Sequence, residues 1–150
     1  MSAFAALLRA HAATTRRLNA QLLTDHGLTL SDYEVLLRLA RADERRMRRV
    51  DLAAQVLLTA SGITRLLEGL ERLGYVERAT CASDRRVVYA VLTDAGLEKV
   101  REASTTHFAQ VDDLFGARLE DAELAELAAL LTRVSDADTP ECAPAEDVSP

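Results

Sequence analysis

The spacing of apolar residues predicts a chain built mainly of α-helices. Between residues 2 and 24, seam positions return at alternating steps of four and three, as in a short coiled-coil stripe. We therefore expect a first helix from about Ser2 to Thr24, with Gly27 closing it in the left-handed conformation. Its seam consists of Phe4, Leu8, His11, Thr15, Leu18 and Leu22.

Three shorter helices are expected in the centre of the chain. Thr29 and Asp32 have the spacing of a capping box, so a helix is predicted directly after Thr29. Asp51 is predicted to be the N-cap of the next helix, which is only about two turns long. Thr59 or Ser61 starts the third helix. Their apolar faces are Tyr33, Leu36, Leu37 and Ala40; Leu52, Ala53 and Val56; and Ile63, Leu66, Leu67, Leu70 and Leu73.

The period of the pattern changes after Gly74, which closes the third of these helices. Residues 75–78 and 87–92 are rich in β-branched and aromatic side chains, which favour strands. The polar residues 79–86 join the two segments. This pattern predicts a two-stranded β-hairpin with a mobile tip.

Two more helices and a tail complete the predicted chain. Thr93 caps a long helix from about Asp94 to Leu114, which Gly116 breaks. A final helix is expected from about Asp121 to Val134. Residues 135–150 are acidic, contain Pro and have few large apolar side chains, so we expect them to be disordered.

The charge distribution qualifies the net charge of −6. Arg38–Thr93 holds eleven Arg and seven acidic residues, a balance of +4, whereas Met1–Leu37 is neutral. Asp94–Pro150 holds four basic and fourteen acidic residues, a balance of −10. A basic centre is therefore flanked by an acidic end, and this centre is compatible with a nucleic-acid partner.

Several classes of protein are not indicated. The chain lacks a signal-peptide pattern and an apolar run of membrane-spanning length, so we expect a cytoplasmic protein without a membrane partner. Cys81 and Cys142 give no disulfide framework. His11, His26 and His107 are scattered, so no metal or other cofactor is expected. A glycine-rich phosphate loop and a nucleophile elbow are missing, and no enzyme is predicted.

The order of the central elements is that of a winged helix-turn-helix. In this architecture the second helix enters the major groove of DNA by its N-terminal end. Small hydroxyl side chains allow a close approach to phosphates or base edges, and Arg65 can donate two hydrogen bonds to guanine. The candidate contacts on this helix are Thr59, Ser61, Gly62, Thr64 and Arg65. The predicted fold is mainly α, with a small β-hairpin wing and a helical dimerisation region.

The hairpin tip carries Asp84, Arg85 and Arg86. One arginine can enter a narrow minor groove while the other meets a phosphate, and Asp84 can hold one guanidinium in a bidentate pair. Taken alone, arginines on a hairpin are more often a solvated edge, and Thr59 and Ser61 more often plain helix caps. The order of the elements is what makes a DNA-binding interpretation specific.

Four stretches of the sequence closely resemble the MarR family of bacterial regulators. The most specific are the Asp-Arg-Arg wing and the Leu-Thr-x-x-Gly run at the start of the long helix. The resemblance covers roughly residues 4 to 134. The four stretches are 52–56, 61–78, 83–86 and 91–96.

The resemblance implies roles for individual residues. Ser61, Thr64 and Arg65 would lie in the major groove. Arg86, the last residue of the family's Asp-x-Arg pattern, would reach the minor groove, with Arg85 adjacent. The resemblance also places an acid at Glu68 on the recognition helix, where it can pair with an arginine of the wing.

The resemblance also implies a homodimer. Residues 1–27 and 95–134 would form the dimerisation region, and residues 28–94 the DNA-binding lobe. The apolar surface of the outer helices, more than a small winged domain covers, independently favours a dimer. A two-fold dimer places its recognition helices about 34–36 Å apart and prefers pseudo-palindromic DNA.

Regulation remains open from the sequence. Many relatives act as repressors and release DNA when a small aromatic acid or phenol binds between the two regions. Candidate lining residues here are His11, Arg16, Arg17, His26 and Tyr33. Structural roles are the commoner ones for such residues: solvated or interface-paired for Arg16 and Arg17, core for Tyr33 and interface for His11. Alternatives are a redox response through Cys81 near basic residues, and a winged module that binds another protein instead of DNA.

Overall fold

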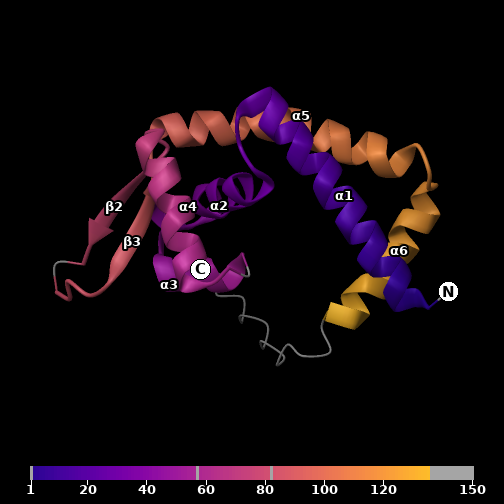
Figure 1. Cartoon of the computed structure of the whole chain (residues 1–150), viewed down its shortest axis with the longest axis horizontal. Helices are drawn as coiled ribbons and strands as arrows, with labels where there is room; N and C mark the ends of the chain where they lie inside the picture. The colour runs from indigo at the N-terminus through magenta and orange to yellow at the C-terminus, as the bar shows by residue number, and fades with distance from the viewer. Residues whose placement is uncertain (1, 57, 82, 136–150) are drawn as a thin grey trace, which may run out of the picture. The chain divides into compact units, whose positions relative to one another are not determined.

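The computed structural model describes residues 2–56, 58–81 and 83–135. The chain divides into two compact units, Met1–Gln110 and Val111–Pro150. The fold is mainly α with a small β-hairpin wing, as predicted (Figure 1). The elements are α1 (Ala3–His26), α2 (Leu30–Arg41), the 3-10 turn η1 (Asp43–Arg45), β1 (Arg46–Arg48), α3 (Arg49–Gln55), α4 (Ala60–Arg72), β2 (Val76–Thr80), β3 (Val88–Leu92), α5 (Asp94–Gly116) and α6 (Asp121–Ser135). The second unit contains the end of α5 and α6. The tail was predicted to start at residue 135, but Ser135 still belongs to α6; the rest of the predicted tail, 136–150, lies outside the described residues.

The wing contains a third strand that the sequence pattern did not predict. The strand order is β1-β3-β2, and both pairings are antiparallel. β1 pairs Met47 with Ala90, so the expected two-stranded hairpin is extended on the side of β3. Residues 41–49 carry no strand signal in the sequence, because Met47 is the only large apolar residue among them.

Most of the predicted helix boundaries are confirmed by cap geometry. Thr29 accepts from the backbone amide of Asp32 at 3.0 Å, and the Asp32 carboxylate accepts from the amide of Thr29 at 2.9 Å, which completes the capping box. Thr59 is the N-cap of α4. Gly27 has φ of 67°, the left-handed conformation that ends a helix, and α1 extends to His26 rather than Thr24.

The prediction that Asp51 caps α3 is wrong. β1 runs directly into α3, so the helix already begins at Arg49, with Arg48 as an N-cap that forms no side-chain cap bond. Asp51 lies in the first turn and accepts from the Arg48 guanidinium at 2.6 and 3.1 Å. A carboxylate in the first turn still favours the helix electrostatically, although it does not cap it.

One hydrophobic cluster organises the first unit, Met1–Gln110. Its largest fully buried side chains are Leu22, Leu28, Val35, Leu36, Leu39, Leu52, Ile63, Leu70, Val76 and Val100. Only the C-terminal part of the α1 seam is buried, because Leu18 and Leu22 are covered while Phe4 and Leu8 are 69% and 52% exposed. Among the described residues no single helix is long and apolar enough to cross a membrane. Helices α3 and α4 reach that length and hydropathy only when they are taken together as a bent pair.

Candidate nucleic-acid interface

The start of α4 presents a polar surface on a helix that is anchored from behind. Ile63, Leu67 and Leu70 are buried in the core, which fixes the rotation of the helix about its axis. Ser61 and Arg65 are exposed on the other side. A helix anchored in this way can offer hydroxyl and guanidinium groups to a groove without rearranging its core.

Hydrogen bonds order the first turn of α4. The Thr59 hydroxyl accepts from the amide of Gly62 at 3.1 Å and lies 3.2 Å from the Ser61 hydroxyl. The Thr64 hydroxyl donates to the carbonyl of Ala60 at 2.8 Å. Thr59 therefore uses two hydrogen-bonding positions locally, whereas Ser61 and Thr64 use one each and retain capacity for an external partner.

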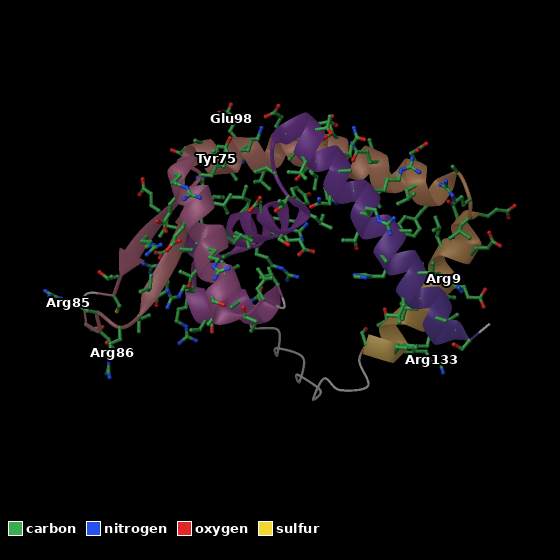
Figure 2. The ribbon with its side chains drawn as sticks, in the orientation of Figure 1. Arg9, Tyr75, Arg85, Arg86, Glu98 and Arg133 are labelled. Atoms are coloured by element: carbon green, nitrogen blue, oxygen red, sulfur yellow. The ribbon has the colours of Figure 1, made fainter. Side chains whose placement is uncertain are left out.

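At the tip of the wing, Asp84 orders Arg86. One oxygen of Asp84 accepts from the backbone amide of Arg86 at 3.0 Å and from its Nε at 3.2 Å. This pairing confirms that the acid holds one arginine, although through a single carboxylate oxygen instead of the bidentate fork. The Arg86 side chain is 92% exposed, and both Arg85 and Arg86 extend outward from the tip (Figure 2).

An ion-pair cluster joins α4 to the wing at Arg78. The Arg78 guanidinium lies 2.5 Å from a Glu71 oxygen and 3.6 Å from a Glu68 oxygen. The hydrogen bond with Glu71 raises the pKa of Arg78 above its ordinary value. The sequence anticipated the acid at Glu68 but missed Glu71, although their spacing of three places both carboxylates on one side of the helix.

Ion pairing sorts the arginines of this region into two groups. In the described residues, acidic partners neutralise Arg45, Arg46, Arg48 and Arg78. Arg65 and Arg85 have no such partner within the same ranges. Arg38, Arg41, Arg49 and Arg72 likewise have no ion pair in these ranges. The positive charge that is available to a polyanion therefore includes Arg65 at the start of α4 and Arg85 at the wing tip, where the sequence placed candidate contacts.

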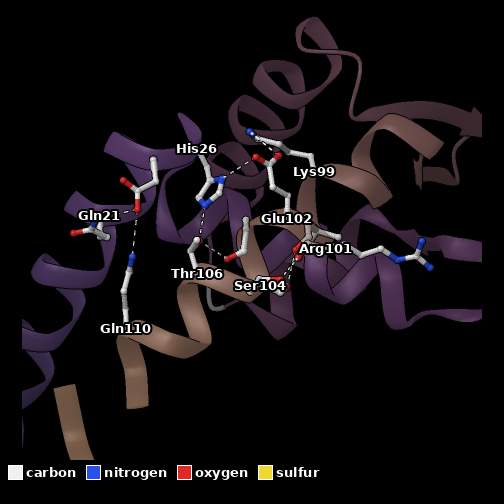
Figure 3. Close-up of polar contacts among 12 residues, drawn as sticks. Gln21, His26, Lys99, Arg101, Glu102, Ser104, Thr106 and Gln110 are labelled. Carbon is white, nitrogen blue, oxygen red and sulfur yellow. Dashed lines mark hydrogen bonds and ion pairs between the residues drawn. The ribbon is translucent and has the colours of Figure 1, made fainter. Parts of the chain in front are cut away.

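Two of the five candidate ligand residues meet α5. His26 Nε2 lies 2.5 Å from the Thr106 hydroxyl, and its Nδ1 lies 3.9 Å from Glu102 (Figure 3). The hydroxyls of Tyr33 and Ser104 lie 3.0 Å apart. Tyr33 is buried, as expected for a core residue, and its ring packs on His107 with centroids 4.6 Å apart.

The other three ligand candidates lie nearer the N-terminus of α1. His11, Arg16 and Arg17 are all exposed. No described contact joins His11 or Arg16 to the cluster around His26 and Tyr33. The structure therefore groups His26 and Tyr33 through α5 and leaves His11 and Arg16 outside that group.

Unpaired polar atoms are concentrated near this cluster. Nδ1 of His26, Nδ1 of His107 and Oε1 of Gln110 are buried without a hydrogen-bond partner among the described residues. Burial lowers the pKa of His107, and the charge of Glu34 opposes that effect. Buried polar atoms without partners are uncommon, and all three lie on α1 or α5.

Cys81 directly follows β2 and is half-buried. Its sulfur is 3.0 Å from the Ser83 hydroxyl, and this hydrogen bond, with the backbone of Ser83 and Asp84, lowers the pKa of the Cys81 thiol. Asp84 opposes the effect through its charge. Cys142 lies outside the described residues.

Comparison with known proteins identifies similar regulators. A sequence model described as MarR family matches residues 26–87. The HTH-type transcriptional regulator MhqR of Bacillus subtilis is 25% identical over 131 residues, covering 87% of this chain and 88% of its own length.

Solved structures extend the similarity over nearly the whole chain. AbsC, a MarR family transcriptional regulator from Streptomyces coelicolor, is 34% identical with a TM-score of 0.77, and the match covers 91% of this chain and 95% of AbsC. Sco3205 from the same organism, solved in complex with DNA, is 29% identical with a TM-score of 0.84, and the match covers 94% of this chain and 88% of that one.

Proposed function

Because this chain is a transcriptional regulator of the MarR family, we propose that it is a homodimeric repressor of pseudo-palindromic operators, released by a small ligand. The observation that carries the proposal is the construction of α4, with its apolar side buried and Ser61 and Arg65 exposed at its start. The family and the matching relatives are regulators and not enzymes, and we propose no enzymatic role.

The proposed contacts divide into two surfaces. Ser61, Thr64 and Arg65 would read base edges in the major groove, with Thr59 and Gly62 close to the backbone. Arg86, oriented by Asp84, would enter the minor groove beside Arg85. The DNA-bound structure of Sco3205 supports a comparable use of this fold.

The test is a screen of genomic fragments with the purified full chain, followed by fluorescence anisotropy on the best fragment. We expect an inverted repeat with half-sites one helical turn apart and a steep loss of affinity with salt. The double variant Arg65→Ala/Arg86→Ala should lose selective binding. Retained operator binding by this variant would contradict the residue assignments. Absence of any DNA binding at low salt would favour the protein-binding alternative.

Exposed apolar side chains support the homodimer. Phe4, Leu7 and Leu8 project from α1 into solvent in the single chain, as Leu130, Leu131 and Val134 do from α6. Large exposed apolar residues in groups mark interaction surfaces. Sedimentation equilibrium should give twice the chain mass, and Phe4→Glu/Leu8→Glu should give the monomer.

The effector proposal rests on the cluster around His26 and Tyr33. An aromatic acid or phenol combines an apolar ring with a polar group that could satisfy His26 Nδ1. A thermal-shift screen of such compounds, followed by release of the bound fragment, tests this proposal. Stabilisation that persists in His26→Ala would place the ligand elsewhere.

The lowered pKa of Cys81 favours a second form of regulation, by oxidation at the wing. This candidate predicts that peroxide releases the DNA fragment from the wild type and leaves Cys81→Ser bound. Equal release in both proteins would exclude it.

A further inference from the structure

A groove of about 180 Å3 lies between the start of α3 and the returning strand of the wing. Three of its lining residues are arginines and three are valines, so it combines positive charge with an apolar surface. The lining residues are Arg48, Arg49, Val50, Arg86, Val87 and Val88.

The three guanidinium groups differ in their existing partners. Asp51 neutralises Arg48 with two hydrogen bonds, at 2.6 and 3.1 Å. Asp84 accepts from the Nε of Arg86, whose terminal nitrogens have no acceptor among the described residues. Arg49 has no ion pair within the described residues and is half-buried, so its charge is the one that the protein leaves uncompensated in this groove.

The position of the groove selects its ligand. The groove shares Arg86 with the wing tip. Its other side is the start of α3, the first helix of the helix-turn-helix, and in this architecture the first helix crosses the DNA backbone. Its volume is below the roughly 300 Å3 at which pockets for drug-sized molecules begin. A single backbone phosphate beside the minor groove fits the charge, the size and the location.

We propose that this groove binds one phosphodiester of the operator backbone and that Arg49 is its principal ligand, an inference that rests on the proposed DNA binding. Arg49 would hold the wing against the DNA backbone while Arg86 enters the minor groove of the DNA. Phosphate contacts carry no direct sequence information, so Arg49 would add affinity without adding discrimination. The sequence pattern did not single out Arg49 because it lies in a run of arginines.

The test compares Arg49→Gln with Arg41→Gln in the full chain. Arg41 is exposed and, like Arg49, has no ion pair in the described residues, but it lines a separate cavity together with Met47. Met47 points to the face of β1 opposite Arg48, because neighbouring strand residues alternate. The control variant therefore removes an equal charge from the same unit away from the groove.

Anisotropy is measured on the operator and on a scrambled duplex between 50 and 200 mM salt. Arg49→Gln should weaken both complexes by the same factor, about tenfold, and reduce the slope of log K against log salt by about 0.9. Arg49→Lys should retain the slope, since it preserves the charge. Arg41→Gln should change neither quantity. Arg49→Ala, checked by circular dichroism, replaces the glutamine variant if that variant unfolds.

Different outcomes would overturn the phosphate site and the proposed DNA binding. An unchanged slope in Arg49→Gln, or a loss restricted to the operator, would overturn the phosphate site while leaving DNA binding intact. Failure of the wild type to bind either duplex at 50 mM salt would overturn the proposed function itself. Stabilisation by inorganic phosphate that depends on Arg49, combined with unchanged DNA binding, would assign the groove to a free anion and overturn the proposal.

Discussion

The backbone carbonyl of Tyr75 lies against the first turn of α5 at Gly96, where a Cβ would stand 2.1 Å from the carbonyl oxygen. The same Cβ would lie 2.7 Å from a methyl carbon of Leu92. Gly96→Ala must therefore displace backbone at the base of the wing. We expect a loss of roughly 1–3 kcal/mol in the free energy of unfolding, measured by urea denaturation.

Gly69 in α4 is the matched control for this substitution. A Cβ at Gly69 would meet only the Arg72 Nη2, at 3.9 Å, which is ordinary contact with a flexible side chain of the same helix. Gly69→Ala should stabilise the protein by up to about 1 kcal/mol, because alanine favours helix. Similar losses in both variants would contradict a steric role for Gly96 at the wing base.

Asp84 is expected to control how selectively the wing binds DNA. Asp84→Asn removes a negative charge that repels phosphate, but it weakens the hold on the Arg86 guanidinium. We expect tighter binding to a scrambled duplex and a several-fold lower ratio of operator to scrambled affinity, measured by anisotropy. The free energy of unfolding should change by less than about 1 kcal/mol, because the pair is on the surface. An unchanged affinity ratio would mean that Asp84 does not orient Arg86 for DNA.

The sequence could predict those features of the fold that depend on local signals. Thr29 and Asp32 are three residues apart, and their capping box needs no information from the rest of the chain. The α4 boundary followed from Thr59, and the buried face of α4 from the helical period. β1 was missed because its pairing is non-local: Arg46 meets Val91 only after the wing has formed. The start of α3 was misplaced for the same reason, since β1 determines where that helix begins.

The candidate site was predictable in type and only partly in geometry. The sequence could place Arg65 and Arg86 on a helix start and a hairpin tip. It could not show that Glu71 forms an ion pair with Arg78 or that Asp51 forms one with Arg48, because each pairing depends on how separate elements or turns are oriented. These ion pairs determine which arginines lack an acidic partner and are available to a ligand.

His107 should make the stability of the protein decrease in mild acid. Burial lowers its pKa in the folded state, whereas the unfolded chain has an imidazole of ordinary pKa near 6.5. As pH falls through that value, the unfolded state binds the proton first, so the free energy of unfolding declines below about pH 6.5. His107→Gln should flatten this part of the profile in urea titrations from pH 7.5 to 5.5. An identical slope in both proteins would show that other groups are responsible.

The Tyr33 and Ser104 hydroxyls should contribute a measurable coupling between α2 and α5. Ser104 donates to the Val100 carbonyl at 2.7 Å, so Tyr33 is the donor in the 3.0 Å contact with Ser104. Tyr33→Phe should cost about 0.5–1.5 kcal/mol, since it removes one donor while Ser104 keeps its bond to Val100. Ser104→Ala leaves the buried Tyr33 hydroxyl without its acceptor and should cost at least as much. A double-mutant cycle with Tyr33→Phe/Ser104→Ala, measured by urea unfolding, should give a coupling of about 0.5–1.5 kcal/mol. A coupling indistinguishable from zero would show that the two hydroxyls are neighbours without a stabilising hydrogen bond.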